Sequence, residues 1–252
     1  MKRKEDSKNN NYDSMSFTDH LEELRQRLLN SIYSILICIF FSFLIIKPLI
    51  SFLEIPASDI HLLQLAPGEF LFVAIKVAGY SGIIVSIPYI FYQIILFISP
   101  GLTKKEKNLI LPAVFGSGLL FFLGLLFSWW ILVPAAINFF INFGADIVEP
   151  TWSIERYFDF VLLLMSSTAI AFQLPVLQFI LGSLGIITTE KMLSNWKIVV
   201  ISSAILSAVI TPSTDPLTMS LLSISIIFLF FVGAGLTYVS ESLKSKTLSS
   251  SH

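Results

Sequence analysis

Two acidic residues stand in basic passages of an otherwise apolar chain. Glu23 lies in "HLEELRQRLL" (residues 20–29), and Glu106 lies in "GLTKKEKN" (residues 101–108). Each passage adjoins long apolar runs, so both carboxylates are expected at a membrane surface. Two carboxylates held at one surface could bind the guanidinium pair of an incoming peptide, because Arg meets a carboxylate in a planar, bidentate geometry that Lys does not reproduce.

Ordinary ion pairing is the competing interpretation for both acids. Glu23 and Arg27 are four residues apart, and a pair at this spacing stabilises a helix by about 0.2–0.5 kcal/mol. Glu106 has lysines on both sides, and a solvated pair there would contribute about 0–1 kcal/mol. The spacing alone leaves peptide binding and structural ion pairing open.

Few other residues could carry chemistry. The chain has one cysteine, Cys38, and three histidines far apart in the sequence, His20, His61 and His252. The sequence also lacks the phosphate-binding loop G-x-x-x-x-G-K-[ST] and the zinc motif H-E-x-x-H. We therefore expect no metal site, no cofactor and no enzymatic activity. We also expect no paired carboxylates within the apolar runs, with Lys76 joined only by neutral polar groups, and so no proton relay.

A membrane domain must position these residues. Hydrophobic residues make up 55% of the 252 residues, and the mean hydropathy is +0.81. Because a segment in lipid must satisfy its own backbone hydrogen bonds, such runs form helices. We predict an all-α integral membrane protein with a single domain at residues 17–240. A disordered polar lead at residues 1–16, without the apolar core of a signal peptide, and a polar tail at residues 241–252 flank it.

The apolar runs predict six transmembrane helices. A span needs roughly 20 apolar residues, and a sixth run, Ile198–Ile210, is shorter than this. With six spans, thirteen of the sixteen Lys and Arg residues fall on one face, which the positive-inside rule assigns, with both termini, to the cytoplasm or stroma. The five long runs are Leu28–Ile46, Phe70–Ser99, Leu109–Phe143, Tyr157–Leu184 and Leu217–Val239.

The short run has two interpretations. A helix over Ile198–Ile210 would be about 20 Å long, against a hydrocarbon core of about 30 Å. The helix could extend back through Met192–Trp196 and cross fully. Alternatively, it could cross incompletely and thin the bilayer locally.

Small residues recur every four positions in two of the runs. Such stripes allow helix backbones to approach closely in lipid, so both are expected at helix–helix contacts. They are Ala74, Ala78, Gly82 and Ser86 in the second span, and Ser203, Ser207 and Thr211 in the fifth.

Three motifs, in order along the chain, resemble the TatC family, the multi-spanning core of the twin-arginine protein translocase. They are "HLEELRQRLL" (20–29), "IPYIFYQIILFISPGLTKKEK" (87–107) and "TPSTDPLTM" (211–219). The pattern F-x-x-P-G-L-x-x-x-E is the specific part of the resemblance. Its residues here are Phe97, Pro100, Gly101, Leu102 and Glu106.

The resemblance implies a cup-like bundle that acts as a receptor. Members of this family recognise twin-arginine signal peptides at the cytoplasmic face and move folded proteins with the proton-motive force. They work with single-span TatA/TatB-type proteins and self-associate in a receptor complex. The implied signal-peptide binding residues are Glu23 and Glu106, with Leu24, Arg25, Phe97, Pro100 and Leu102 beside them in the same motifs.

Gln173 departs from this family, many of whose members have Glu at the matching position. An amide keeps hydrogen bonding but cannot carry a proton as a carboxylate does. Gln173 lies two residues before Pro175, so it could bond the backbone carbonyls that the proline leaves free. It could instead contact a partner helix, as the resemblance implies, together with Ser203 and Ser207.

Three further positions are expected to be structural. Asp215 matches an acid of the family motif, and it can cap the last span with Pro216 at the first helical position. Pro48 and Pro212 lie near the ends of spans, where proline starts or ends helices.

A small-solute transporter or channel is the alternative function. It predicts charged or broken helices around a midplane site, for which the sequence offers mainly Gln173 and Pro88. The compartment also has two candidates. Lys outnumbers Arg twelve to four, and Ile, Phe and Asn are abundant, which indicates an AT-rich coding genome. We therefore predict a plastid thylakoid membrane, with a bacterial inner membrane as the alternative.

Overall fold

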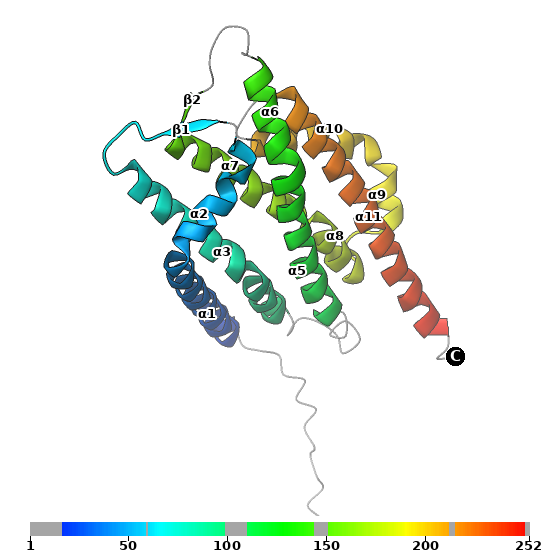
Figure 1. Ribbon diagram of the computed structural model, residues 1–252. Coiled ribbons are helices and arrows are strands. Elements are labelled where there is room, and N and C mark those ends of the chain that lie inside the picture. Colours follow the sequence, from blue (N-terminus) through cyan, green and yellow to red (C-terminus); the bar gives the residue numbers. More distant parts are fainter. Residues whose placement is uncertain (1–16, 59, 99–109, 144–150, 212–214, 250–252) are drawn as a thin grey trace, which may run out of the picture.

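The computed structural model is a bundle of long helices (Figure 1). It describes residues 17–58, 60–98, 110–143, 151–211 and 215–249. Helix α1 (Phe17–Leu44) begins, and α11 (Pro216–Ser249) ends, at the same end of the bundle, the lower end in Figure 1. We call this end the base, and the opposite end, with the two short strands, the top. Residues 241–249, predicted as part of a polar tail, continue α11.

Five helical segments of the described chain are long and apolar enough to cross a membrane. This confirms the five long runs predicted from the sequence. The segments are Thr18–Leu44, Glu69–Ile98, Leu111–Phe143, Ile154–Ser183 and Pro216–Ser242. The first starts well before the predicted Leu28, because the amphipathic passage around Glu23 continues into the span as a single helix.

Prolines divide two of these passages at the positions that their geometry requires. A proline ring clashes with the carbonyl four residues earlier, so a helix ends near that residue. Pro48 has Leu44 at this position, and α1 ends there before α2 (Ile46–Glu54). Pro175 has Ala171 at this position, and α7 (Ile154–Ala171) ends there before α8 (Leu174–Ser183).

The third span is continuous but contains one wide turn. Helix α5 (Ile110–Phe127) passes into the π-helical segment η3 (Ser128–Leu132), which is followed by α6 (Val133–Phe143). The Val133 N–H donates to the Ser128 carbonyl, five residues earlier. Pro134 follows directly and cannot donate a backbone hydrogen bond, so the wide turn lies where the regular helical pattern is interrupted.

The small-residue stripe of α3 (Glu69–Ile98) packs against α1. Ala74, Ala78, Gly82 and Ser86 are all buried. A Cβ added at Gly82 would lie 2.5 Å from Cγ1 and 2.6 Å from Cα of Ile39 on α1. The two backbones are therefore in direct contact, as the stripe predicts, and this contact fixes α1 against α3.

The top of the bundle contains a small parallel sheet that the sequence did not predict. Strand β1 (His61–Leu63) follows the 3-10 turn η1 (Ile55–Ala57) and pairs with β2 (Thr151–Ser153). The register sets Leu62 opposite Trp152. Below the sheet, the buried Tyr157 donates from its hydroxyl to the Leu53 carbonyl at 2.7 Å, which ties α7 to α2.

The helix of the short apolar run begins at Trp196, and the alternative in which it extends back to Met192 as one helix is wrong. Helix α9 (Thr189–Ser194) ends at Asn195, which leaves helical geometry with φ −95° and ψ 17°. Helix α10 (Trp196–Ile210) then has 15 residues, or about 22 Å at 1.5 Å per residue. Thinning of the bilayer around it remains a prediction.

Candidate functional site

Glu23 lies at the base, where the first turns of α1 pass the last turns of α3. Its carboxylate Oε1 accepts a hydrogen bond from Nη2 of Arg27 at 3.3 Å. The other terminal nitrogen of Arg27, Nη1, donates to Oε1 of Gln93 on α3 at 3.2 Å. We call this chain of contacts the Glu23–Arg27–Gln93 bridge. It confirms the predicted i,i+4 ion pair and also links the two helices.

The bridge leaves one carboxylate oxygen without a partner. Glu23 Oε2 is buried and accepts no hydrogen bond from any residue that the structure describes. The Glu23 side chain as a whole is only 16% exposed, and Gln93 is 4% exposed. A buried acceptor without a donor is unfavourable, since it has lost water and gained nothing in exchange. The base therefore presents an anionic oxygen that a donor from another molecule could satisfy.

An aromatic stack lies beside the bridge. The imidazole of His20 and the ring of Phe97 are stacked, with centroids 4.4 Å apart and planes 18° apart. His20 is one helical turn before Glu23, and Phe97 is one turn after Gln93. The structure thus brings two predicted binding residues, Glu23 and Phe97, to the same contact between α1 and α3.

The neighbouring motif residues face away from this contact. Arg25 pairs with Glu22 at 3.2 Å, and both side chains are about 70% exposed, as in a solvated helix ion pair. Leu24 is also exposed. The predicted residues Pro100, Leu102 and Glu106, and the structural Pro212, lie outside the described residues.

Sequence reasoning missed Gln93 and His20 as members of this site. Gln93 is 66 residues from Arg27, so no helical spacing rule connects them. A signal was nevertheless present, because Gln93 stands one helical turn before the motif residue Phe97 and is the only strongly polar side chain in the run "YIFYQIILFI".

Gln173 lies in the break between α7 and α8. Its amide Nε2 donates to the carbonyl of Ser117 on α5 at 3.2 Å. The alternative in which it bonds the carbonyls left free by Pro175 is therefore wrong. Its Oε1 is buried and has no hydrogen-bond partner among the described residues. Like Glu23, Gln173 presents a buried acceptor, but an uncharged one within a span.

Ser203 and Ser207 face the interior of this chain. Ser203 Oγ lies 3.1 Å from Ser223 Oγ of α11, and Ser207 Oγ donates to the Ala204 carbonyl at 2.9 Å. Both serines are fully buried. The stripe therefore packs α10 against α11, and contact of these serines with a partner helix remains a prediction.

Asp215 caps α11. Its Oδ1 accepts the backbone N–H of Thr218 at 2.7 Å, and its Oδ2 accepts the Thr218 hydroxyl. The residue is buried. Pro216 is the first helical residue, as the cap interpretation requires. Pro48 lies in the first turn of α2.

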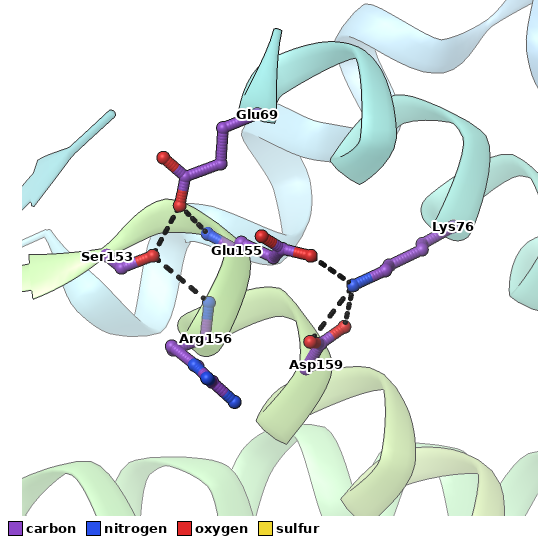
Figure 2. A network of polar contacts seen from close by, with 6 residues as sticks. All are labelled: Glu69, Lys76, Ser153, Glu155, Arg156 and Asp159. Atoms are coloured by element: carbon purple, nitrogen blue, oxygen red, sulfur yellow. Dashed lines mark hydrogen bonds and ion pairs between the residues drawn. The ribbon is translucent and has the colours of Figure 1, made fainter. Parts of the chain in front are cut away.

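A second polar cluster lies at the top (Figure 2). Glu69, the first residue of α3, is 5% exposed. Its Oε2 accepts the backbone N–H groups of Leu65 and Ala66 at 2.6 and 3.1 Å. Its Oε1 accepts the Ser153 hydroxyl and the Glu155 N–H. One carboxylate thus ties the segment after β1, together with β2 and α7, to the start of α3.

Lys76 joins the same cluster and corrects an expectation from the sequence. Its ammonium donates to Oε1 of Glu155 at 2.7 Å and to Oδ1 of Asp159 at 2.8 Å (Figure 2). The expectation that the spans lack paired carboxylates, and that Lys76 meets only neutral groups, is therefore wrong. Glu155 and Asp159 are one turn apart in the first six residues of α7, so the cluster lies at the N-terminal end of that helix.

The described residues contain no group of three His, Cys, Asp or Glu side chains that could hold a metal ion. The two clusters are instead built from carboxylates, guanidinium or ammonium groups and amides. Such groups can bind cationic or hydrogen-bonding ligands and can hold helices together.

Comparison with known proteins gives consistent results. A profile described as "Sec-independent protein translocase protein (TatC)" matches residues 19–225. The protein TatC of Synechocystis sp. is 52% identical over 221 residues, which cover 88% of this chain and 87% of that protein. The chloroplastic TATC of Arabidopsis thaliana is 48% identical over 222 residues, which cover 87% of this chain and 65% of that protein. A crystal structure of the twin-arginine translocase receptor TatC superposes with a TM-score of 0.76 at 34% identity, covering 88% of this chain and 99% of that one.

Proposed function

This chain belongs to the TatC family and is a receptor subunit of the Sec-independent protein translocase, and we propose that Glu23 and Glu106 bind the arginines of its signal peptides. It is a multi-pass membrane protein and a transport receptor rather than an enzyme. Binding at the base of the bundle would commit a folded cargo protein to transport driven by the proton-motive force.

The unpartnered carboxylate oxygen of Glu23 is the observation that carries this proposal. It lies between two helices that are fixed against each other by the Gly82 contact. Phe97 lies beside it and offers an apolar ring to the residues that flank the arginines. A guanidinium supplies both the positive charge and the donors that this oxygen lacks.

Glu106 supplies the second carboxylate of the proposal. It lies in the segment that connects the end of α3 to the start of α5, both of which are at the base (Figure 1). A twin-arginine signal has two guanidinium groups, so two acids match it in number. Arg is favoured over Lys because each planar guanidinium can donate two parallel hydrogen bonds.

We further propose that the chain crosses the membrane six times, with both termini in the cytoplasm or stroma. The common position of the start of α1 and the end of α11 supports an even number of crossings. The distribution of Lys and Arg, thirteen on the side of the termini against three, supports the orientation. Similarity to chloroplastic and Synechocystis proteins supports the plastid thylakoid as the membrane.

The signal-binding proposal is tested by crosslinking a twin-arginine leader peptide to the full chain in membranes. Glu23→Gln and Glu106→Gln should each lower the crosslink yield about tenfold or more, because loss of one partner of a desolvated charge pair costs about 2–5 kcal/mol. Glu22→Gln is the matched control, since Glu22 is an exposed neighbour paired with Arg25. An undiminished yield in a correctly inserted Glu23→Gln protein would contradict the proposal.

A partner helix of TatA/TatB type is proposed to pack beside α8 and α10. The unpartnered Oε1 of Gln173 supports this, because an amide oxygen in lipid gains from any donor. The outer face of α10, with Ile201, Ile205 and Val209 exposed, offers apolar surface for the same helix. Gln173→Leu should reduce crosslinking to a single-span partner, and an unchanged yield would count against docking at this amide. We also propose that receptor subunits self-associate, which crosslinking between copies of this chain would test.

A further inference from the structure

We propose that Arg27 is the resident counter-ion of Glu23, and that a signal-peptide arginine binds by exchanging one guanidinium for another. The inference rests on the proposed function, since it concerns the same carboxylate. It adds a residue that competes with the ligand, Arg27, and a positioning residue, Gln93, to the site.

A peptide guanidinium can reach the Glu23 carboxylate only after Arg27 has moved away from it. Arg27 occupies Glu23 Oε1 at 3.3 Å, and Oε2 has essentially no exposed surface. An incoming cation therefore finds neither oxygen open while Arg27 stays in place. When Arg27 swings away, the carboxylate becomes able to accept two parallel hydrogen bonds from a new guanidinium.

The exchange lowers the affinity of every ligand for Glu23, so that only tight ligands bind. Replacing Arg27 by a peptide arginine substitutes like for like, so little electrostatic energy is lost. Replacing it by a lysine substitutes an ammonium that cannot match the planar geometry. Because Arg27 competes with every ligand for the same carboxylate, it weakens all of them by the same factor. The preference for Arg over Lys remains a property of the carboxylates, and Arg27 decides which ligands bind measurably at cellular concentrations.

Gln93 keeps the counter-ion in reach during the exchange. Its side chain is 4% exposed, and its Oε1 holds Arg27 Nη1 at 3.2 Å, independently of Glu23. The guanidinium can therefore release Glu23 by rotating about the Gln93 contact while that hydrogen bond is kept. When the peptide leaves, Arg27 is already positioned to return.

The test measures the dissociation constants of a twin-arginine leader and its twin-lysine counterpart for the full chain in lipid nanodiscs. Arg27→Gln should tighten both by the same factor, about fivefold, which is equivalent to about 1 kcal/mol. Arg27→Lys and Gln93→Met should each tighten both by about twofold, because they weaken the resident contact without removing it. Lys197→Gln is the charge control, since it removes an exposed cation from α10 and should change neither constant.

A double-mutant cycle separates competition from general electrostatics. In a Glu23→Gln background, Arg27→Gln should have no effect, because the contested carboxylate is gone. The inference is overturned if Arg27→Gln or Arg27→Lys weakens the twin-arginine leader in a correctly inserted protein. It is also overturned if the gain persists without Glu23 or is matched by Lys197→Gln. If Glu23→Gln alone leaves twin-arginine binding intact, the proposed function fails; if only the Arg27 variants behave otherwise, the proposed function stands and this inference fails.

Discussion

The base and the top of the bundle each hold a cluster of carboxylates and cations. The two clusters differ in how many of their carboxylate oxygens have hydrogen-bond partners. At the top, both oxygens of Glu69 accept hydrogen bonds, and the Lys76 ammonium contacts two carboxylates (Figure 2). At the base, Glu23 has one oxygen paired with Arg27 and one buried without a partner.

This difference separates a cluster whose acceptors are all satisfied from one that keeps an unsatisfied acceptor, to which we assign peptide binding. A saturated cluster gains nothing from a new ligand but loses much when one member is removed. The base cluster loses less stability when Glu23 is neutralised, because this carboxylate accepts only one hydrogen bond, from Arg27. Mutations at the top should therefore reduce stability, and mutations at the base should reduce peptide binding.

The largest effect is expected for Glu69→Ala. It leaves the Ser153 hydroxyl and the N–H groups of Leu65 and Ala66 without their acceptor, and should therefore clearly lower the unfolding temperature. Thermal unfolding in detergent measures this. Glu54→Ala, at an exposed glutamate of α2, is the control. Equal stability of the two variants would show that the top cluster does not hold the fold.

Gly82→Ala should have the next largest effect, and it should change both the stability of the fold and the binding of the leader peptide. A methyl group would overlap the backbone of Ile39 and push α1 from α3, at a cost of about 2 kcal/mol. Because the same contact sets Glu23 beside Phe97, binding of a twin-arginine leader should weaken as well. Gly79→Ala, on the same helix with nothing within 4 Å of the added carbon, should change neither. If the Gly82→Ala variant bound the leader as tightly as the wild type does, the binding site would not depend on this helix contact.

Lys76→Gln should cost about 1 kcal/mol of stability, because it leaves Glu155 and Asp159 facing each other without a cation. The loss is modest because all three side chains are between 33% and 42% exposed and water screens their charges. Adding Asp159→Asn should restore part of the loss, which a double-mutant cycle would show. A loss that Asp159→Asn leaves untouched would mean that carboxylate repulsion is not its cause.

The smallest effect is expected for Glu22→Gln. The Glu22–Arg25 pair is exposed, so its loss should change stability by less than about 0.5 kcal/mol. Binding of the leader should also be unchanged within a factor of two. A binding loss as large as that of Glu23→Gln would mean that burial does not distinguish the two neighbouring acids.

Sequence periodicity predicted those features that arise within one helix. The Glu23–Arg27 pair follows from the i,i+4 spacing, and Pro48 indicated a helix end nearby, although the predicted span ran to Ile46 and α1 ends at Leu44. The stripe containing Gly82 predicted a close helix contact before its partner was known. Each of these depends on neighbours in the chain, which a single sequence displays directly.

Contacts between helices were not predictable in the same way. Lys76 meets Glu155 from 79 residues away, and Arg27 meets Gln93 from 66 residues away. Neither distance has a spacing rule, because the pairing depends on how two spans pack. The strands at His61–Leu63 and Thr151–Ser153 were missed for another reason. Three residues are too few to display alternation, and their pairing is imposed by the helices on either side.

The central claim is that two carboxylates, Glu23 between α1 and α3 and Glu106 in the segment that follows α3, select guanidinium groups. The most direct test compares binding of twin-arginine and twin-lysine leaders, otherwise identical, to the purified full chain in lipid nanodiscs. We predict that the twin-arginine leader binds at least tenfold more tightly and that Glu23→Gln removes most of this preference. Equal binding of the two leaders to the wild-type chain would contradict the claim.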